Sequence, residues 1–98
     1  MSYDDKIAED ARLIILKELA EQVDGRMNEV GLSRVLDLFA IRRSREWVRT
    51  QMRKLAELET VRVTEAGTVL VASIRTLGRN HVERREVVDG ISRPSDEA

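Results

Sequence analysis

Residues 42–54 read RRSREWVRTQMRK, and the concentration of charge in this stretch decides the fold that we expect. Six of these side chains are cationic and only Glu46 is acidic, which gives a net charge of +5. The whole chain of 98 residues has a formal net charge of −1, and residues 1–22 alone carry −3. This asymmetry indicates one basic and one acidic face.

The same stretch has the periodicity of an amphipathic helix. The apolar side chains that fall within about 60° of one another on a helical wheel are Val48, Met52 and Leu55. A separate stripe with a spacing of four residues contains Arg45, Arg49 and Arg53. Ser44 can accept a hydrogen bond from the free amides at the start of such a helix. We therefore predict a helix over residues 45–58 with one apolar and one basic side.

Two further helices are predicted before this one. A spacing of three and four residues between apolar positions indicates an amphipathic helix from Asp4 to Gln22. Its apolar face contains Ile7, Ala8, Ala11, Ile14, Ile15, Leu19 and Val23. Gly25 marks the break that follows, and Asn28 is placed to cap a second helix over residues 29–39. The residues that this helix is expected to bury are Val30, Leu32 or Val35, Leu36 and Phe39.

After the third helix the composition changes to that of a β-hairpin. β-Branched residues occur on both sides of a turn at residues 65–68. The second strand, residues 69–74, is the more continuously apolar and should be the better buried. Thr76 can then cap a short last helix that runs to about Arg85.

The chain is long enough for one domain with a single modest core. We assign residues 1–86 to this domain. The composition of VVDGISRPSDEA indicates that residues 87–98 form an irregular, mobile tail. No apolar run is long enough to cross a bilayer, and the N-terminus lacks the layout of a signal peptide, so we expect a cytoplasmic protein.

The composition argues against catalysis and metal binding. The chain has no cysteine, which excludes disulfides, thiolate chemistry and the common zinc sites, and its one histidine is His81. A serine hydrolase would need His81, which lies in a polar, arginine-rich stretch without a glycine-framed serine nearby. We therefore expect no enzymatic activity, no metal and no cofactor, and we interpret His81 as a surface residue of the last helix.

Three helices, the third with a basic stripe, are followed by a hairpin and a short helix. This is the element order of a winged helix-turn-helix domain, an α+β fold that is mainly α. A helix of this diameter fits the major groove of DNA, where guanidinium groups pair with guanine edges or phosphates. We therefore predict double-stranded DNA as the partner. The residues expected to contact it are Arg42, Arg43, Ser44, Arg45, Arg49, Thr50, Arg53, Lys54 and Arg62.

The expected roles within this set differ. Groove contacts are predicted for Arg45 and Arg49, which lie nearest the helix start. The predicted phosphate or backbone contacts are those of Arg42, Arg43, Arg53, Lys54 and Arg62. The alternative is that the stripe is only a solvated helix face. Trp47 borders the apolar and basic sides, and we favour packing in the core or an interface over stacking on a sugar or base.

Several segments resemble a known family. MSYDDKIAEDARLIILKELA, SREWVRTQMRKLAEL, TLGRNHV and GISRP are similar to segments of the small winged-helix proteins of Mu-like phages and prophages, often labelled ArsR-type transcriptional regulators. The resemblance implies a phage-encoded winged helix from the middle and late genes, near those for DNA packaging. It admits both a transcription regulator and an accessory of packaging or assembly. Metal sensing of the ArsR kind is not expected, because the cysteine and histidine clusters that it uses are missing.

Two further expectations concern protein partners. The first helix is long and acidic, and winged helices commonly dimerise through terminal helices, so we predict a homodimer. The competing functional hypothesis is a protein-interaction module that uses the winged-helix fold as a scaffold to bind another phage protein in packaging or assembly.

Overall fold

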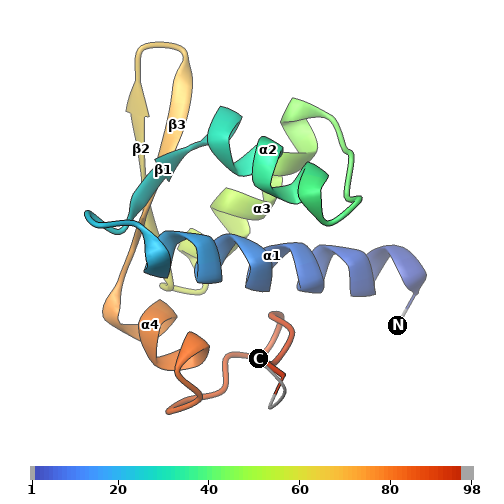
Figure 1. Cartoon of the computed structure of the whole chain (residues 1–98), viewed down its shortest axis with the longest axis vertical. Helices are drawn as coiled ribbons and strands as arrows, with labels where there is room; N and C mark the ends of the chain where they lie inside the picture. The colour runs from blue at the N-terminus through green and yellow to red at the C-terminus, as the bar shows by residue number, and fades with distance from the viewer. Residues whose placement is uncertain (1, 96–98) are drawn as a thin grey trace.

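The computed structural model describes residues 2–95 of the chain. The elements in chain order are α1 (Tyr3–Glu21), β1 (Arg26–Asn28), α2 (Glu29–Leu38), α3 (Arg45–Glu57), β2 (Val61–Ala66), β3 (Val69–Ile74) and α4 (Thr76–Val82). Figure 1 shows α1 crossing the molecule, with α2 and the tip of the β2–β3 hairpin on one side of it and α4 on the other. The fold is α+β and mainly helical, as predicted. Among the helices of residues 2–95, none combines the length and the apolar character needed to cross a membrane.

α1 is the long helix against which the other helices pack. Ser2 caps it, because its hydroxyl accepts from the Asp5 amide at 3.1 Å while the Asp5 carboxylate accepts from the Ser2 amide at 3.3 Å. The side chains that it buries are Ala11, Ile15, Leu16 and Leu19. The predicted bounds are correct to within one residue at each end. Val23, however, is fully exposed, because the helix ends at Glu21 and the chain then leaves the apolar face.

α2 begins as predicted but buries fewer residues. The Asn28 side chain accepts from the Gly31 amide at 2.9 Å and so caps the helix. Its buried apolar residues are Leu32 and Leu36. The prediction that Val30 and Phe39 are buried is wrong, since both are exposed. Phe39 follows the last helical residue, and Ala40 then takes a left-handed backbone conformation with φ 61°, which turns the chain and leaves the Phe39 ring at the surface.

The sheet has three antiparallel strands in the order β1-β3-β2. The predicted hairpin is present, with Val61 opposite Ile74, and its short turn places Gly67 at φ +62°, a conformation that suits glycine. β1 was not predicted, because three residues show no detectable alternation. It exists through its pairing with β3, which sets Met27 opposite Ala72. β3 is therefore the central strand, which explains its more continuous apolar character.

The core lies between the helices and the sheet. Its fully buried apolar residues are Ala11, Ile15, Leu16, Leu19, Leu32, Met52, Leu55 and Ala72. α3 contributes the predicted apolar face and contacts both α2 and β2. Thr60 fixes the corner between α3 and β2, because its hydroxyl donates to the Leu55 carbonyl at 2.8 Å. α3 is thereby held in place at its end as well as along its side.

α4 differs from the prediction at both ends. Thr76 is the first helical residue and not the cap, since Arg75 occupies the cap position and makes no side-chain capping bond. The helix ends at Val82 and not near Arg85, because Arg84 takes a left-handed conformation with φ 63°.

His81 is 1% exposed, so the prediction that it is a surface residue is wrong. Its Nδ1 accepts a hydrogen bond from the Val88 amide at 3.1 Å, which leaves Nε2 to donate to the Ser92 carbonyl at 2.9 Å. The imidazole is therefore neutral, with its proton on Nε2. It joins α4 to the segment that follows.

Residues 87–95 form neither helix nor strand, and they pack onto α1. Ile91 joins the hydrophobic core, and the Ser92 amide donates to the Glu9 carbonyl at 3.2 Å. Arg12 donates from Nη1 to the Gly90 carbonyl at 2.7 Å. The described part of the expected tail thus belongs to the same packed unit as the domain before it. Residues 96–98 of that expected tail lie outside the described residues.

Candidate nucleic-acid interface

α3 is anchored along one side and presents the other to solvent. Ser44 caps it as predicted, with its hydroxyl accepting from the Trp47 amide at 3.1 Å. Gln51, on the buried side, accepts from Nε of Arg12 on α1 at 2.9 Å, and this bond helps to fix the rotation of the helix. The exposed stripe opposite the buried side contains Glu46, Thr50, Arg53 and Glu57. The outermost surface of α3 is therefore mixed in charge.

Arg45 and Arg49 turn toward one buried carboxylate. Each donates from Nε to Oε2 of Glu29 at 2.7 Å. Their Nη2 groups donate to the Thr68 carbonyl, at 3.2 Å from Arg45 and 2.7 Å from Arg49. The Leu70 amide donates to the other carboxylate oxygen, Oε1, at 2.5 Å. These five residues, termed the Glu29 cluster, tie the start of α2 to α3 and to the hairpin.

The Glu29 cluster stabilises the ionised form of the Glu29 carboxylate. Glu29 is 2% exposed, and burial alone would raise its pKa. The hydrogen bond from Arg49 opposes this effect most strongly, and Arg45 and the Leu70 amide add to it, so that the pKa falls to about 2. The same pairing raises the pKa of Arg49. Two guanidinium groups around one carboxylate leave the cluster with a net charge of +1.

The structure therefore separates the basic residues of the predicted interface into those with a carboxylate partner and those without one. Arg45 and Arg49 are engaged in the Glu29 cluster, with 54% and 26% of their side chains exposed. Lys54 pairs with a carboxylate of its own helix, with its Nζ 3.9 Å from Oε2 of Glu57. Within the predicted interface, the exposed arginines that have no carboxylate within ion-pair distance among residues 2–95 are Arg42, Arg43, Arg53 and Arg62. Thr50 directs its hydroxyl to a carbonyl of its own helix, at 3.0 Å.

Trp47 packs partly into the molecule. Its side chain lies against the hydrophobic core, and the guanidinium of Arg43 lies over its ring, 5.5 Å from the centroid. This stacking holds Arg43 close to the start of α3. The arrangement agrees with the favoured packing role of the tryptophan.

Glu29 is the member of this site that the sequence pattern does not reveal. An acid in the first turn of a helix is commonly explained by its favourable interaction with the helix dipole. The arginines that it binds follow 16 and 20 positions later, on another helix. Within the described residues, no group of three or more His, Asp or Glu side chains is arranged to hold a metal ion.

Comparison with known proteins shows the family of the chain. No family model matches it, so the ArsR label gains no support, and no solved structure matches it. It is 34% identical over 94 residues to a protein of Escherichia phage Mu described as "Uncharacterized protein gp26". The alignment covers 96% of this chain and 97% of the Mu protein, which supports the Mu-like phage origin implied by the sequence segments. The chain belongs to the family of phage Mu gp26.

Proposed function

We propose that this protein is a winged helix-turn-helix protein that binds double-stranded DNA and regulates transcription in a Mu-like phage or prophage. The order α1-β1-α2-α3-β2-β3, with the hairpin beside α3, supports the winged-helix assignment. The observation that carries the DNA-binding proposal is the set of exposed arginines around α3 and on β2. These are Arg42, Arg43, Arg53 and Arg62, none of which has a carboxylate partner among residues 2–95.

These arginines suit contacts to the DNA backbone on both sides of α3. Arg42 and Arg43 precede the helix, Arg53 lies on its outward stripe, and Arg62 belongs to the hairpin. Phosphate contacts of this kind fix the position of a protein on the duplex and supply most of its non-specific affinity. An α-helix with phosphate contacts on both sides of it can enter the major groove.

The Glu29 cluster changes the role that we assign to two of the predicted groove contacts. Arg49 uses Nε and Nη2 inside the protein and is mostly covered, so we assign it to positioning α3 against the hairpin. Arg45 makes the same two contacts, but more than half of its side chain is exposed, and it can still border the groove. Base contacts would then come from Arg45 and from Thr50 on the outward stripe, while Arg53 on the same stripe contacts the backbone.

Fluorescence anisotropy with duplexes from the phage's own intergenic DNA, titrated over a range of salt concentrations, tests the proposal. The logarithm of the binding constant should fall linearly with the logarithm of the salt concentration. Arg42→Ala and Arg53→Ala should each weaken binding several-fold and reduce the steepness of this dependence by about 1, the effect of losing one phosphate contact.

Arg85→Ala serves as the matched control. Arg85 is another exposed arginine, but it follows α4, outside the predicted interface, and pairs with Glu83 at 3.3 Å. Its removal should leave binding unchanged. Absence of binding at low salt, or equal losses from Arg85→Ala and Arg53→Ala, would overturn the proposal.

A second candidate function is a protein-interaction module in phage packaging or assembly. The observation that favours it is the mixed charge on the outermost stripe of α3, where Glu46 and Glu57 accompany Arg53. In this case a pull-down from infected cells recovers a phage packaging or assembly protein. Arg53→Glu then leaves that complex intact, whereas it should weaken binding to DNA by more than Arg53→Ala does.

A further inference from the structure

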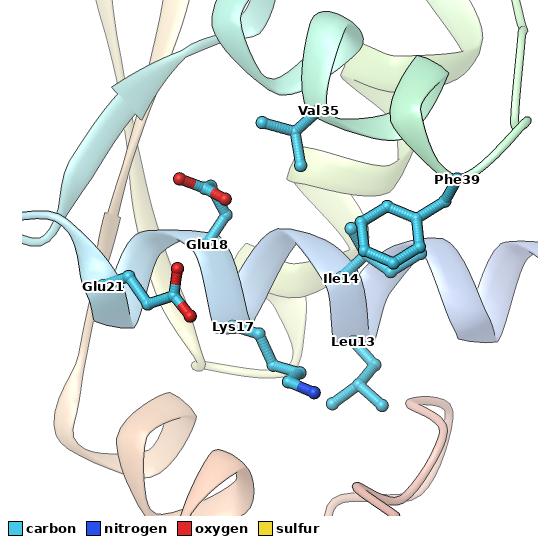
Figure 2. A pocket seen from close by; sticks show the side chains of 7 residues that line it. All are labelled: Leu13, Ile14, Lys17, Glu18, Glu21, Val35 and Phe39. Carbon is cyan, nitrogen blue, oxygen red and sulfur yellow. The ribbon is translucent and has the colours of Figure 1, made fainter. Parts of the chain in front are cut away.

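An apolar groove lies between α1 and the C-terminal end of α2, and none of the arginines of α3 lines it. Two adjoining hollows form it, and both are lined by Leu13, Ile14 and Phe39. Figure 2 shows the first hollow, where the Phe39 ring lies next to Ile14 while Lys17, Glu18 and Glu21 line the neighbouring turns of α1. The apolar residues of this surface, termed the α1 groove, are Tyr3, Ile7, Leu13, Ile14, Val35, Phe39, Ala40 and Ile41.

The α1 groove exposes aromatic surface that the fold of one chain leaves uncovered. Phe39 is 60% exposed and Tyr3 78% exposed, beside the partly buried Leu13 and Ile14. Large aromatic residues near the centre of a hollow, surrounded by polar groups, are typical of the central part of a protein interface. The composition of the α1 groove therefore points to a protein partner.

The charges along α1 identify that partner. Counted from the midpoint between Leu13 and Ile14, Lys6 lies as many positions before it as Glu21 lies after it. Asp10 and Lys17 are related to the midpoint in the same way. We propose that the α1 groove is the interface of a homodimer. In this dimer α1 packs antiparallel against α1 of a second copy, across a two-fold axis between Leu13 and Ile14.

In this arrangement the facing charges are opposite in sign. Lys6 faces the partner's Glu21 and Asp10 faces the partner's Lys17, and the symmetry makes each pair twice. On a helical wheel Asp10 and Lys17 lie about 20° apart and Lys6 and Glu21 about 60° apart, so all of them border the same side of α1. All are at least partly exposed in the single chain. Lys6 and Asp10 form an ion pair with each other there at 3.5 Å, with 56% and 42% of their side chains exposed, so the dimer would add the partner's charges to this surface pair.

The alternative arrangements lack this match. A parallel pair of α1 helices would set each charge against its own copy, which is repulsive. Glu9 and Glu18 would mirror each other in the antiparallel pair, but they are nine residues apart and lie about 180° from each other around the helix, so they do not face one another. The antiparallel pair is thus the arrangement that the charges favour.

The proposed two-fold axis also leaves the hairpins available. Figure 1 shows α2 and the tip of the β2–β3 hairpin on one side of α1. A two-fold axis that runs parallel to the long axis of this view, between the two α1 helices at their midpoints, keeps both hairpin tips on the same side of the dimer. The dimer does not depend on the DNA-binding proposal, since its interface uses none of the arginines assigned to DNA.

Sedimentation equilibrium of the full chain tests the apolar centre of the interface. The wild-type chain should be a dimer, and Phe39→Ala should weaken association by about tenfold or more, as expected for an aromatic side chain at an interface centre. Leu38→Ala is the matched control, because Leu38 is 84% exposed, adjacent in sequence and outside the α1 groove. Leu38→Ala should associate as strongly as the wild type. Since both side chains are exposed, neither truncation removes a core contact.

A charge exchange tests the antiparallel register. Lys17→Glu sets two acids against each other in its own homodimer, and Asp10→Lys sets two lysines against each other. Each variant alone should associate more weakly than the wild type. An equimolar mixture should associate better than either variant. In the heterodimer the two substituted side chains face each other with opposite charges, and the unsubstituted Asp10 and Lys17 still form their natural pair.

Three results would overturn the homodimer. They are a wild-type chain that stays monomeric up to about 1 mM, an equal loss of association in Leu38→Ala and Phe39→Ala, and a mixture of charge variants no better than its components. Asp10 also accepts a hydrogen bond from Ser92, so circular dichroism should verify the fold of Asp10→Lys. If that variant is unfolded, the comparison of Phe39→Ala with Leu38→Ala tests the homodimer on its own.

Discussion

Among single residues, Glu29 determines how α3 sits against the hairpin. Its carboxylate accepts from Arg45, Arg49 and the Leu70 amide while almost fully buried. Glu29→Gln keeps the shape of the side chain but replaces a charged acceptor by a neutral one. We expect the free energy of unfolding at pH 7, measured by urea denaturation, to fall by about 1.5–3 kcal/mol, the range for hydrogen bonds to charged groups. Asp37→Asn, an exposed carboxylate on the same helix, should change it by less than about 0.5 kcal/mol.

The effect of Glu29→Gln should depend on pH. The folded pKa of Glu29, about 2, lies below its ordinary value of 4.5. A carboxylate with a lowered pKa contributes stability that is complete above its unfolded value and is lost as the pH falls toward its folded value. The stability difference between wild type and Glu29→Gln should therefore shrink as the pH falls from about 5 to about 2. A difference that stays constant over this window would show that the carboxylate charge is not what stabilises the cluster.

The arginines of the candidate interface could be predicted from their spacing, but their orientation could not. Four-residue spacing places Arg45 and Arg49 on one stripe of a helix, and the helix is present. Their direction depends on Glu29 and on the Thr68 carbonyl, which reach them only after α2 and the hairpin have packed against α3. Local sequence pattern contains no information on such long-range partners. It could therefore predict neither that Glu29 belongs to the site nor that Arg45 and Arg49 turn toward it.

Among the elements, α4 owes its position to a residue without a side chain. A Cβ on Gly78 would clash with the Thr60 carbonyl, and it would lie 3.0 Å from Ile74 and 3.2 Å from Leu16. Since the carbonyl belongs to the corner that ends α3, α4 would have to move as a whole. We expect Gly78→Ala to lower the free energy of unfolding by about 1–3 kcal/mol, as overpacking does, although alanine favours helices.

Gly31→Ala is the matched control for this prediction, because Gly31 also lies within a helix. A Cβ there would meet the side chain of Met27, which is flexible and can turn aside. The gain in helix propensity, up to about 1 kcal/mol, should offset that adjustment. Thermal unfolding of both variants makes the comparison, and a Gly78→Ala variant as stable as Gly31→Ala would show that α4 can shift without loss.

The elements that the sequence pattern predicted are those with a repeating period. α1, α2, α3 and the hairpin have one, and their bounds agree with the prediction to within one or two residues. β1 has too few residues to show a period and exists through β3. Phe39 and His81 were misplaced because burial at the end of a helix depends on the next turn of the chain and on the segment that packs over it. These features arise from tertiary contacts.

At the scale of the whole molecule, the segment after α4 closes the core. Ile91 is 5% exposed and lies in the hydrophobic cluster, and His81 beneath the segment bonds to Val88 and Ser92. We expect Ile91→Ala to lower the free energy of unfolding by about 2–5 kcal/mol, the range for truncating a buried isoleucine. Val87→Ala, in the same segment but 57% exposed, should have little effect.

Urea denaturation followed by both circular dichroism and Trp47 fluorescence provides the measurement for Ile91→Ala. Because the segment shares the core with α1, the two signals should report one transition, shifted to lower urea in Ile91→Ala. Trp47 lies on α3, on a different element from the substitution, so a shift in its signal means that the whole molecule is destabilised. Equal stability of Ile91→Ala and Val87→Ala would instead show that the segment only covers a core that is complete without it.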